Sequence, residues 1–363
     1  MKMKPISRRK FIGSAALVTV GSGILGIKKL YGGSLNSKSK DIVSIVRIKD
    51  GNTGRAVEEA IDLLGGMQRV TEGINSILLK PNLVAPSEHC TTKPAVVKTL
   101  AQLMLRSGKE VMIGEGSAAA ESFNVKGGET FRTKKKEILD KMQAYVFENL
   151  GYTEMAKALN IPLINLHSGD IINVNLERGY ASNTLKMHKV LSEVDLICSV
   201  PMMKTHTLAT VSLAMKNLIG LYPGTEYYSV RSWLHDRAAE RGSSGVAYEV
   251  IDMNRAVKTG LSVIDASTAM EGNGPFDGTL VDMGLIIAGT SALATDMVGA
   301  TLMGFGINEI PVLNLAHESG MEPGSLSDIE IRGLTIDQAK RKFVKPLMSK
   351  WTDINKFWGV KEL

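Results

Sequence analysis

The chain contains few cysteines and few aromatic residues for its length. Cys90 and Cys198 are the only cysteines among 363 residues, so at most one disulfide can form. Iron–sulfur clusters and structural zinc sites use closely spaced cysteines. We therefore expect no iron–sulfur cluster and no cysteine-based zinc site. Aromatic residues make up only 5% of the chain, which argues against binding of single-stranded nucleic acid through base stacking.

Several well-known catalytic motifs are also absent. The chain has no G-x-x-x-x-G-K-S/T loop and no G-x-G-x-x-G run after its first expected strand. These absences argue against a P-loop nucleotidase and a Rossmann dinucleotide site. It also lacks the G-x-S-x-G and H-E-x-x-H patterns, so the usual signals of a serine hydrolase and of a zinc protease are missing.

The excess of basic residues is confined to the N-terminal segment. The formal net charge is +6, but residues 1–40 hold nine basic residues and no acidic one, which leaves 34 basic and 37 acidic residues in the remainder. The charge of this remainder gives no reason to expect a polyanion as partner. We therefore expect no nucleic-acid partner.

The N-terminus has the pattern of a twin-arginine signal. Residues Ser7–Ile12 read SRRKFI, and a weakly apolar stretch follows. This predicts a signal or anchor over residues 1–30, a linker over 31–40, and the twin-arginine translocation machinery as a partner. The protein is then exported across the cytoplasmic membrane and is periplasmic or membrane-tethered. Lys28–Lys29 interrupts the expected cleavage region, so cleavage stays open, and an uncleaved N-terminus would be the only contact with the membrane.

Strand-like and helix-like runs alternate from residue 41 onward. This alternation implies βαβ units, so we expect an α/β fold with a mostly parallel sheet flanked by helices over residues 41–335. Residues 120–195 are predicted to form an irregular α+β insertion, and 336–363 a C-terminal tail helix. The strands are expected at 42–48, 77–79, 111–113, 162–166, 196–200, 261–264, 285–288 and 329–331. The helices are expected at 53–64, 94–106, 130–150, 153–159, 211–218, 248–257, 292–303 and 310–318.

Four of the expected strands end in polar residues. These ends hold Lys80–Asn82, Glu115–Ser117, Lys204–His206 and Asp265–Glu271. The carboxyl ends of parallel strands share one edge of the sheet, where α/β folds bind ligands. A single such end can be a solvated loop, but the four together predict a site for a small anionic molecule. Residues 221–244, rich in Gly, Tyr, Ser and Arg, predict a long loop over this edge.

The residue types at this edge suggest separate roles in catalysis and binding. Carboxylates, histidine and lysine are the usual acid–base groups of enzymes, and lysine and amide side chains bind anions. The candidate catalytic residues are His206, Lys204, Glu115 and Asp265. The candidate substrate-binding residues are Lys80, Asn82, Ser117, Lys216, Asn217 and Asn273.

His206 is the histidine with the most informative surroundings. It follows Lys204 by two residues and lies between two threonines. Imidazole titrates near neutral pH, which suits a general base or a metal ligand; the alternative is a histidine that caps the following helix. With Glu271 and Asp296 it forms the candidate ligand set for a divalent metal. The cofactor is otherwise unknown.

Several motifs in this region resemble those of one prokaryotic family. They are Lys80–Leu83 (KPNL), Lys204–His206 (KTH), Lys216–Gly220 (KNLIG), Met270–Pro275 (MEGNGP) with Gly278 after it, and Ala292–Asp296 (ALATD). Together they resemble the domain of unknown function 362 family over residues 77–306. The resemblance implies an exported protein of the twin-arginine type. Some members carry a ferredoxin-like module, but two cysteines cannot ligate its clusters, so the redox role of those members does not carry over.

Three interpretations of the function remain open. The first is an enzyme that acts on a small anionic substrate at the carboxyl edge of the sheet, with or without a metal. The second is a protein that binds a metabolite or metal without chemistry. The third is an accessory factor for another exported redox protein.

Overall fold

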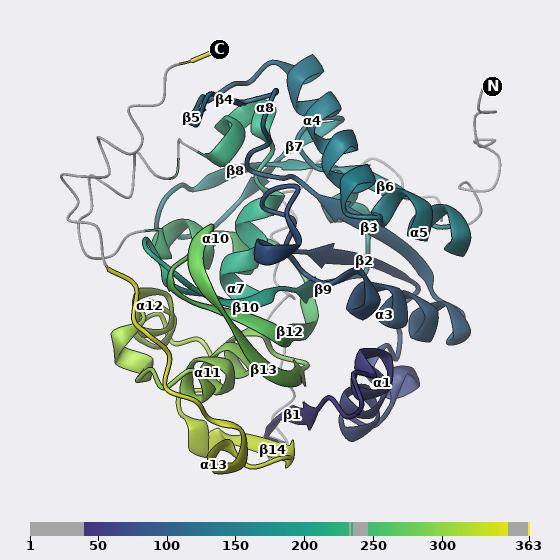
Figure 1. Ribbon diagram of the computed structural model, residues 1–363, viewed down its shortest axis with the longest axis vertical. Coiled ribbons are helices and arrows are strands. Elements are labelled where there is room, and N and C mark those ends of the chain that lie inside the picture. Colours follow the sequence, from purple (N-terminus) through teal and green to yellow (C-terminus); the bar gives the residue numbers. More distant parts are fainter. Residues whose placement is uncertain (1–39, 232–233, 235–245, 348–361) are drawn as a thin grey trace, which may run out of the picture. The chain divides into compact units, whose positions relative to one another are not determined.

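One large sheet runs through the described part of the chain (Figure 1). The computed structural model describes residues 40–231, 234, 246–347 and 362–363. The strands of this sheet are β1 (Asp41–Arg47), β2 (Ser76–Pro81), β3 (Glu110–Glu115), β6 (Leu163–Asn165), β9 (Leu196–Val200), β10 (Met202–His206), β11 (Thr210–Ser212), β12 (Thr259–Asn273), β13 (Asp277–Gly289) and β14 (Ile329–Gly333).

The sheet is mostly parallel. Its strands follow the order β14-β1-β13-β12-β9-β2-β3-β6. β13 is antiparallel to both of its neighbours, and each other pair along this path is parallel. This confirms the α/β fold expected from the sequence. The carboxyl ends of β2, β3 and β9 therefore lie along one edge of the sheet.

Helices cover both faces of the sheet, which gives three layers (Figure 1). They are α1 (Thr53–Leu63), α2 (Met67–Val70), α3 (Pro94–Arg106), α4 (Lys136–Asn149), α5 (Tyr152–Leu159), α6 (Val190–Glu193), α7 (Ala214–Asn217), α8 (Gly224–Tyr227), α10 (Ala247–Ala256), α11 (Ala292–Leu302), α12 (Pro311–Glu318) and α13 (Ile336–Ala339). Side chains alternate between the faces of a strand, and β2 shows the result. Ile77 and Leu79 pack into the core beneath α1, α3, α4 and α5, whereas Leu78 packs into the core on the opposite face.

Local sequence explains where the helices next to the site begin. In α1, the Asn52 side chain accepts a hydrogen bond of 3.0 Å from Arg55 N, the usual role of an N-cap residue. In α3, Pro94 occupies the first turn, where its missing N–H costs no hydrogen bond. Helix α1 packs on β1 and α3 packs on β3. Both helices belong to the core on one face of the sheet, and α7 and α11 belong to the core on the opposite face.

Two parts of the sequence fold differently from expectation. The helix expected over 211–218 is shorter, because residues 210–212 form β11 and only Ala214–Asn217 are α-helical. The strand expected at 261–264 continues as β12 to Asn273, paired with β13 along its length. β9 and β10, which are separated by Pro201, both pair in parallel with β12. β9 pairs with its first part and β10 with the part that follows. Asp265 therefore lies inside a strand and not at its end.

The middle segment is only partly separate from the sheet. Residues 120–195 include α4, α5 and β6, and β6 forms the last strand of the main sheet beside β3. Two small antiparallel pairs lie outside the main sheet: β4 (Val125–Lys126) with β5 (Glu129–Thr130), and β7 (Ile171–Asn175) with β8 (Thr184–His188).

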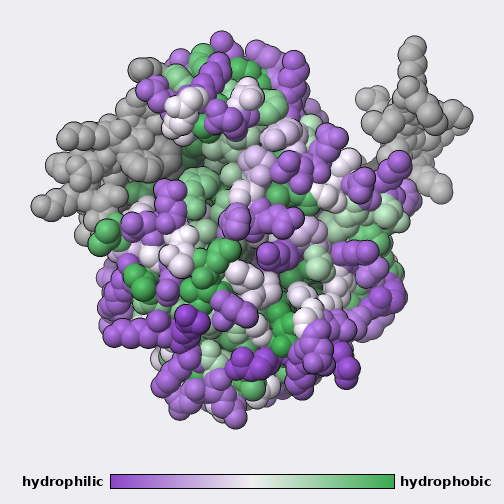
Figure 2. All heavy atoms as spheres, viewed as in Figure 1, coloured by the Kyte–Doolittle hydropathy of each residue, from purple (hydrophilic) through white to green (hydrophobic). Residues whose placement is uncertain are grey.

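The C-terminal segment after α13 is not helical where it is described. The expected tail helix begins as α13 over residues 336–339, but residues 340–347 contain no helix, so it does not continue there. Residues 348–361 lie outside the described residues. The twin-arginine pattern also lies outside them. No helix among the described residues is both long enough and apolar enough to span a bilayer. On the face shown in Figure 2, hydrophilic residues form most of the outline, and hydrophobic residues show between them nearer the middle.

Candidate functional site

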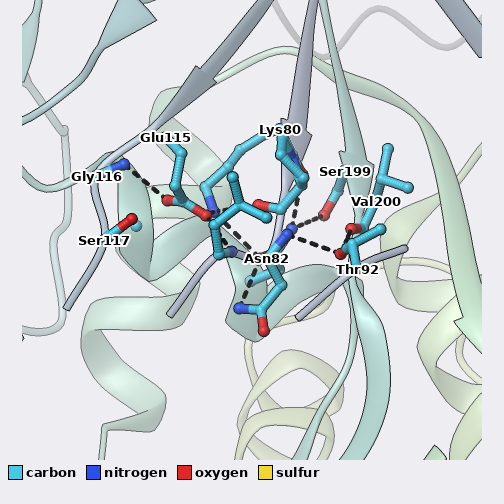
Figure 3. Close-up of polar contacts among 12 residues, drawn as sticks. Lys80, Asn82, Thr92, Glu115, Gly116, Ser117, Ser199 and Val200 are labelled. Atoms are coloured by element: carbon cyan, nitrogen blue, oxygen red, sulfur yellow. Dashed lines mark hydrogen bonds and ion pairs between the residues drawn. The ribbon is translucent and has the colours of Figure 1, made fainter. Parts of the chain in front are cut away.

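Two adjacent parallel strands place Lys80 beside Glu115. Leu79 of β2 lies opposite Ile113 of β3, so both charged residues lie where their strands end. The Lys80 Nζ is 2.8 Å from Glu115 Oε2, and the side chains are 1% and 3% exposed. Figure 3 shows this pair with Gly116 and Ser117 on one side and Asn82 on the other. A buried ion pair needs partners for its remaining polar atoms as well.

Both members of this ion pair make further hydrogen bonds. Leu83 N donates to Glu115 Oε2, and Gly116 N donates to Glu115 Oε1, each over 2.8 Å. Lys80 Nζ donates to the carbonyl of Pro81 over 2.8 Å and to Asn217 Oδ1 over 3.1 Å. All three N–H donors of Lys80 are therefore occupied, which holds the pair in place at the site.

Two asparagines extend the network from Lys80 to Lys204. Asn217 Nδ2 donates to the carbonyl of Lys80 over 2.9 Å and to Ser199 Oγ over 3.1 Å. Asn82 Nδ2 donates to Asn217 Oδ1 over 3.3 Å, and Lys204 Nζ donates to Asn82 Oδ1 over 2.7 Å. One chain of hydrogen bonds thus joins Glu115 to Lys204 and draws on β2, β3, β10 and α7.

Lys204 keeps one N–H without an acceptor in this network. Its second bond is to the carbonyl of Cys90, over 2.8 Å, and an ammonium group has three N–H donors. Burial lowers the pKa of Lys204 to about 8, although Glu115 nearby raises it. Lys204 is therefore mainly protonated at neutral pH and can donate to a ligand.

Lys216 is the least constrained of the three lysines. It is partly buried on α7 and makes no hydrogen bond or ion pair with the residues that the structure describes. Burial and the positive charges of Lys204, Lys80 and Arg231 lower its pKa to about 7. An unpaired amine among cations is the arrangement expected of an anion site or an acid–base group.

Arg231 adds a fourth cation that the sequence did not single out. Its Nη1 donates to the carbonyl of Ser117 over 3.2 Å, and its Nη2 donates to the carbonyls of Gly116 and, over 3.0 Å, Gly220. The residue is 2% exposed, and burial lowers its pKa to about 10. It comes from the segment expected to be a long loop, where no local pattern distinguishes one arginine from another.

Gly220 allows the backbone to approach the ion pair closely. A Cβ at this position would lie 2.4 Å from Glu115 Oε1 and 2.6 Å from Lys80 Nζ. These distances are shorter than any van der Waals contact, so a side chain here would displace the pair. The glycine at the end of the K-N-L-I-G motif is therefore required by the site and not only by a helix end.

Ser117 anchors a second polar cluster next to the first. Its N–H donates to Gln143 Oε1 over 2.7 Å, and its carbonyl accepts from His167 Nε2 over 2.7 Å as well as from Arg231. Burial and the charge of Arg231 hold the pKa of His167 well below its usual range, so this imidazole is neutral. Neither Gln143 nor His167 was expected in the site, because both come from the middle segment and contact Ser117 only through the fold.

Asp296 holds the short helix that carries Lys216 and Asn217. Its Oδ1 accepts from Ala214 N over 2.7 Å, and its Oδ2 from Met215 N over 2.8 Å. Burial raises its pKa to about 7, against the effect of these two hydrogen bonds. Asp296 is thus a capping residue of α7, and both of its oxygens are occupied by backbone N–H groups.

Glu271 and Asn273 contact the C-terminal segment and not the lysines. Glu271 Oε2 accepts from Val344 N over 2.9 Å, and Asn273 Oδ1 accepts from Leu347 N over 3.0 Å. Asn273 is exposed at the end of β12. The M-E-G-N-G-P motif is therefore a hairpin connection that holds residues 340–347, which differs from the expected substrate-binding and metal-binding roles.

Asp265 and His206 are also held by neighbouring backbone groups. Asp265 Oδ2 accepts from Lys93 N, at the start of α3, over 2.8 Å, and its Oδ1 accepts from Ser267 Oγ over 2.6 Å. Burial raises its pKa. His206 Nδ1 accepts from Leu208 N over 3.0 Å. This contact lies in the turn between β10 and β11 and does not cap a helix, which differs from the alternative considered for this histidine.

The three candidate metal ligands do not form a metal site. In the described residues, no group of three or more His, Cys, Asp or Glu side chains is placed to hold a metal ion. His206, Glu271 and Asp296 each bind the backbone of a different segment. The structure therefore corrects the expectation of a divalent metal held by this set.

Both cysteines are free and buried. Burial raises the pKa of the Cys90 thiol, although the charge of Lys204 opposes this, and it raises the pKa of the Cys198 thiol strongly. Thiols in this state are poor nucleophiles. They act in the core, as expected for Cys198, and Cys90 contributes to the site through its carbonyl.

A pocket of about 490 Å³ is lined by none of Lys80, Lys204 and Lys216. It is lined by α10, α12 and the C-terminal segment, including Tyr248, Phe305 and Lys345. Lys345 pairs there with Glu309 at 2.5 Å. The pocket shares no residue with the Lys80–Lys204 network, so the polar network and not this pocket marks the candidate site.

The comparisons with known proteins agree with the motifs. A family model described as "Domain of unknown function (DUF362)" matches residues 77–301, which confirms the resemblance. The thylakoid-associated protein sll1697 of Synechocystis sp. is 26% identical over 287 residues, covering 77% of this chain and 80% of that protein.

One solved structure with a similar course of the chain is the lactate racemase apoprotein from Thermoanaerobacterium thermosaccharolyticum. The TM-score is 0.43 and the sequence identity 12%, and the match covers 74% of this chain and 57% of that chain. This chain thus spans little more than half the length of the racemase.

Proposed function

Because the chain belongs to the family described as domain of unknown function DUF362, whose description names no reaction, we propose a function from the site itself. The chain binds a small carboxylate- or phosphate-bearing molecule beside Lys216 and transfers a proton to or from it. The observation that supports this is the Lys216 amine, which has no partner among the described residues and around which Lys80, Lys204 and Arg231 supply further positive charge.

The charges of the described site residues are unbalanced in favour of an anion. Lys80, Lys204, Lys216 and Arg231 surround one carboxylate, Glu115. In the described residues, Glu115 forms its ion pair with Lys80 and not with Lys216. Buried charge that lacks a counter-ion is unfavourable, and a bound oxyanion would supply one.

Two lysines with lowered pKa values suit proton transfer. With a pKa of about 7, Lys216 is partly a neutral amine at neutral pH and can accept a proton. With a pKa of about 8, Lys204 stays mainly an ammonium and can stabilise developing negative charge. Asn82 holds Lys204 in place. Both pKa values lie well below 10.5, the ordinary value for lysine, and lowered values of this kind are common at functional sites.

Binding is tested by isothermal titration calorimetry with sulfate and acetate. We expect Lys216→Met to weaken binding at least tenfold, because a charge-assisted hydrogen bond contributes about 1.5–3 kcal/mol. Lys98→Met is the matched control, since Lys98 is exposed on α3 and should leave the affinity unchanged. Equal affinity in the wild type and Lys216→Met would remove Lys216 from the site.

Proton transfer is tested separately by proton NMR in D2O. Small carboxylates that bind should lose the signal of the proton on the carbon beside the carboxylate, and Lys216→Met should abolish this exchange. If the small carboxylates bind and none of them loses this proton signal, the proposed enzymatic activity is rejected. The second candidate function, a non-catalytic anion-binding protein, then remains. The Lys80–Glu115 pair is the observation that favours that candidate, because all three donors of Lys80 and the carboxylate of Glu115 are engaged in holding the fold together.

A further inference from the structure

Three buried donor groups around Ser117 have no acceptor among the residues that the structure describes. They are Ser117 Oγ, Gln143 Nε2 and Arg231 Nε. The residues that carry them are 0%, 0% and 2% exposed. Buried polar groups in folded proteins are nearly always hydrogen-bonded, and each exception calls for a reason. Here three exceptions lie around one residue, which indicates that an acceptor belongs there.

The orientation of each donor is fixed by its other contacts. Gln143 Oε1 accepts from Ser117 N, so an amide flip would set an NH2 group against an N–H donor and is excluded. Arg231 Nη1 and Nη2 are held by the carbonyls of Ser117, Gly116 and Gly220. The unpartnered Nε therefore stays next to this carbonyl cluster.

His167 does not supply an acceptor for the three unpartnered donors. His167 Nδ1 is also unpartnered, but it lies against Gly224, where a Cβ would come within 2.4 Å of it. The backbone of Gly224 therefore lies close to this nitrogen. The unfilled hydrogen-bonding capacity at Ser117 is therefore that of donors, which suits the oxygens of a carboxylate or phosphate group.

This donor cluster adjoins the lysines. Ser117 follows Glu115 by two residues. Arg231 Nη2 bonds the carbonyl of Gly220, and Gly220 lies directly against the Lys80–Glu115 pair. Glu115, the one carboxylate in this part of the described chain that acts on Lys216 and Arg231, is neutralised by Lys80. The donors around Ser117 and the lysines thus both adjoin the same ion pair.

We propose that Ser117, Gln143 and Arg231 form a second oxyanion subsite, so that the ligand carries two oxyanion groups, as a dicarboxylate or a phosphorylated carboxylate does. The inference rests on the proposed function, because the first oxyanion is the one bound beside Lys216. The second group supplies affinity and orientation, and it is held by donors that the empty site leaves unsatisfied. Its binding fixes which carbon of the ligand faces Lys216.

A dicarboxylate length series tests the subsite. Malonate, succinate and glutarate are titrated calorimetrically against the full chain, with acetate, propionate and butyrate as single-carboxylate controls. We expect one dicarboxylate to bind at least tenfold more tightly than each monocarboxylate, and the preferred length to report the separation of the two subsites. If the dicarboxylates bind no better than the monocarboxylates, the donors hold only water and the subsite is rejected.

Two conservative variants locate the effect. Ser117→Ala removes a hydroxyl that makes no hydrogen bond, and Gln143→Glu keeps the acceptor for Ser117 N while replacing the NH2 donor with an anionic oxygen. Both should lower the ratio of dicarboxylate to monocarboxylate affinity at least fivefold. Thr259→Val is the control, because Thr259 Oγ1 is also buried and unpartnered but lies at the start of β12, opposite the start of β9. An unchanged ratio in both variants would overturn the assignment.

The titrations also separate the two proposals. Absence of binding by any mono- or dicarboxylate would reject the anion site itself, and with it the proposed function. Binding of all of them with equal affinity would leave the site beside Lys216 in place and reject only the second subsite.

Discussion

Three lysines of the site share one functional group and differ in their partners. Lys80 donates to three acceptors, Lys204 to two, and Lys216 to none among the described residues. Burial lowers the pKa of all three amines, and the positive charges of Lys204, Lys80 and Arg231 lower that of Lys216 further. Lys80 is therefore structural, Lys204 orients a ligand, and Lys216 responds to one.

The pKa of Lys216 predicts a pH-dependent affinity for anions. Below about pH 7 this amine is protonated and attracts an anion, and above it the charge is lost. The affinity should therefore fall as the pH rises from 6 to 9, by roughly tenfold for one charged hydrogen bond. Sulfate is the suitable probe, because its charge is constant over this range, and calorimetry at each pH gives the affinity.

Lys216→Met provides the control for this pH dependence. The variant should bind sulfate weakly and with a flatter pH profile, to which only Lys204, with its pKa of about 8, still contributes. A slope equal to that of the wild type between pH 6 and 7.5 would show that another group titrates, and would contradict the role given to Lys216.

At the level of single residues, the sequence predicted the part of the site that follows strand ends. Lys80, Asn82 and Glu115 follow buried apolar runs, and parallel pairing brings such ends together. Arg231 and Gln143 could not be found this way, because their contacts with Ser117 depend on distant segments. Only the hydrogen bonds of the folded chain identify these two residues, and a sequence does not show those bonds.

Among the secondary-structure elements, α7 shows how the fold supports the site. A helix of four residues is not stable alone, and α7 begins where Asp296 of α11 accepts hydrogen bonds from Ala214 and Met215. It places Lys216 and Asn217 on consecutive positions. The A-L-A-T-D motif looked like a metal ligand in sequence, because a carboxylate that caps a distant helix has no local pattern to reveal it.

Asp296 should make stability depend on pH in an unusual direction. Its pKa is raised to about 7 in the folded chain from 3.8 as the ordinary value. The folded state then holds a proton that the unfolded state loses between about pH 4 and 7, so stability falls as the pH rises through this range. Relative to Asp296→Asn, the free energy of unfolding of the wild type should fall by on the order of 2–3 kcal/mol.

Urea unfolding at pH 5 and pH 8 measures this difference. The asparagine variant is the matched control, because it keeps the shape of the side chain and cannot ionise. A difference between wild type and variant that is the same at both pH values, or that grows in favour of the wild type at pH 8, would contradict the raised pKa of Asp296.

At the scale of the whole molecule, the C-terminal segment of residues 340–347 contacts elements that are distant from it in sequence. The family model ends at residue 301, yet residues 340–347 return to the body of the described chain. Arg341 N and Phe343 N donate to the carbonyls of Leu302 and Met303 over 2.8 and 3.0 Å, and Val344 bonds the β12 end at Gly272. The sequence predicted a tail helix here, because basic and aromatic residues are compatible with one. The extended form is stabilised instead by hydrogen bonds from the backbone of other elements.

The docking of residues 340–347 predicts a large loss of stability for a substitution at one residue and almost none for a substitution at its neighbour. Phe343 is 3% exposed and packs in the core with α11 and α12, whereas the Val344 side chain is 60% exposed and only its backbone makes contacts. Phe343→Ala should lower the free energy of unfolding by about 3–5 kcal/mol, as for a buried aromatic residue. Val344→Ala should change it by less than about 0.5 kcal/mol. Urea unfolding of both variants measures the contrast. Because typical domains are stable by only about 5–15 kcal/mol, the first loss would be a large share of the total. Equal, small effects would show that residues 340–347 do not dock in solution, and the hairpin contacts of Glu271 and Asn273 would then be absent as well.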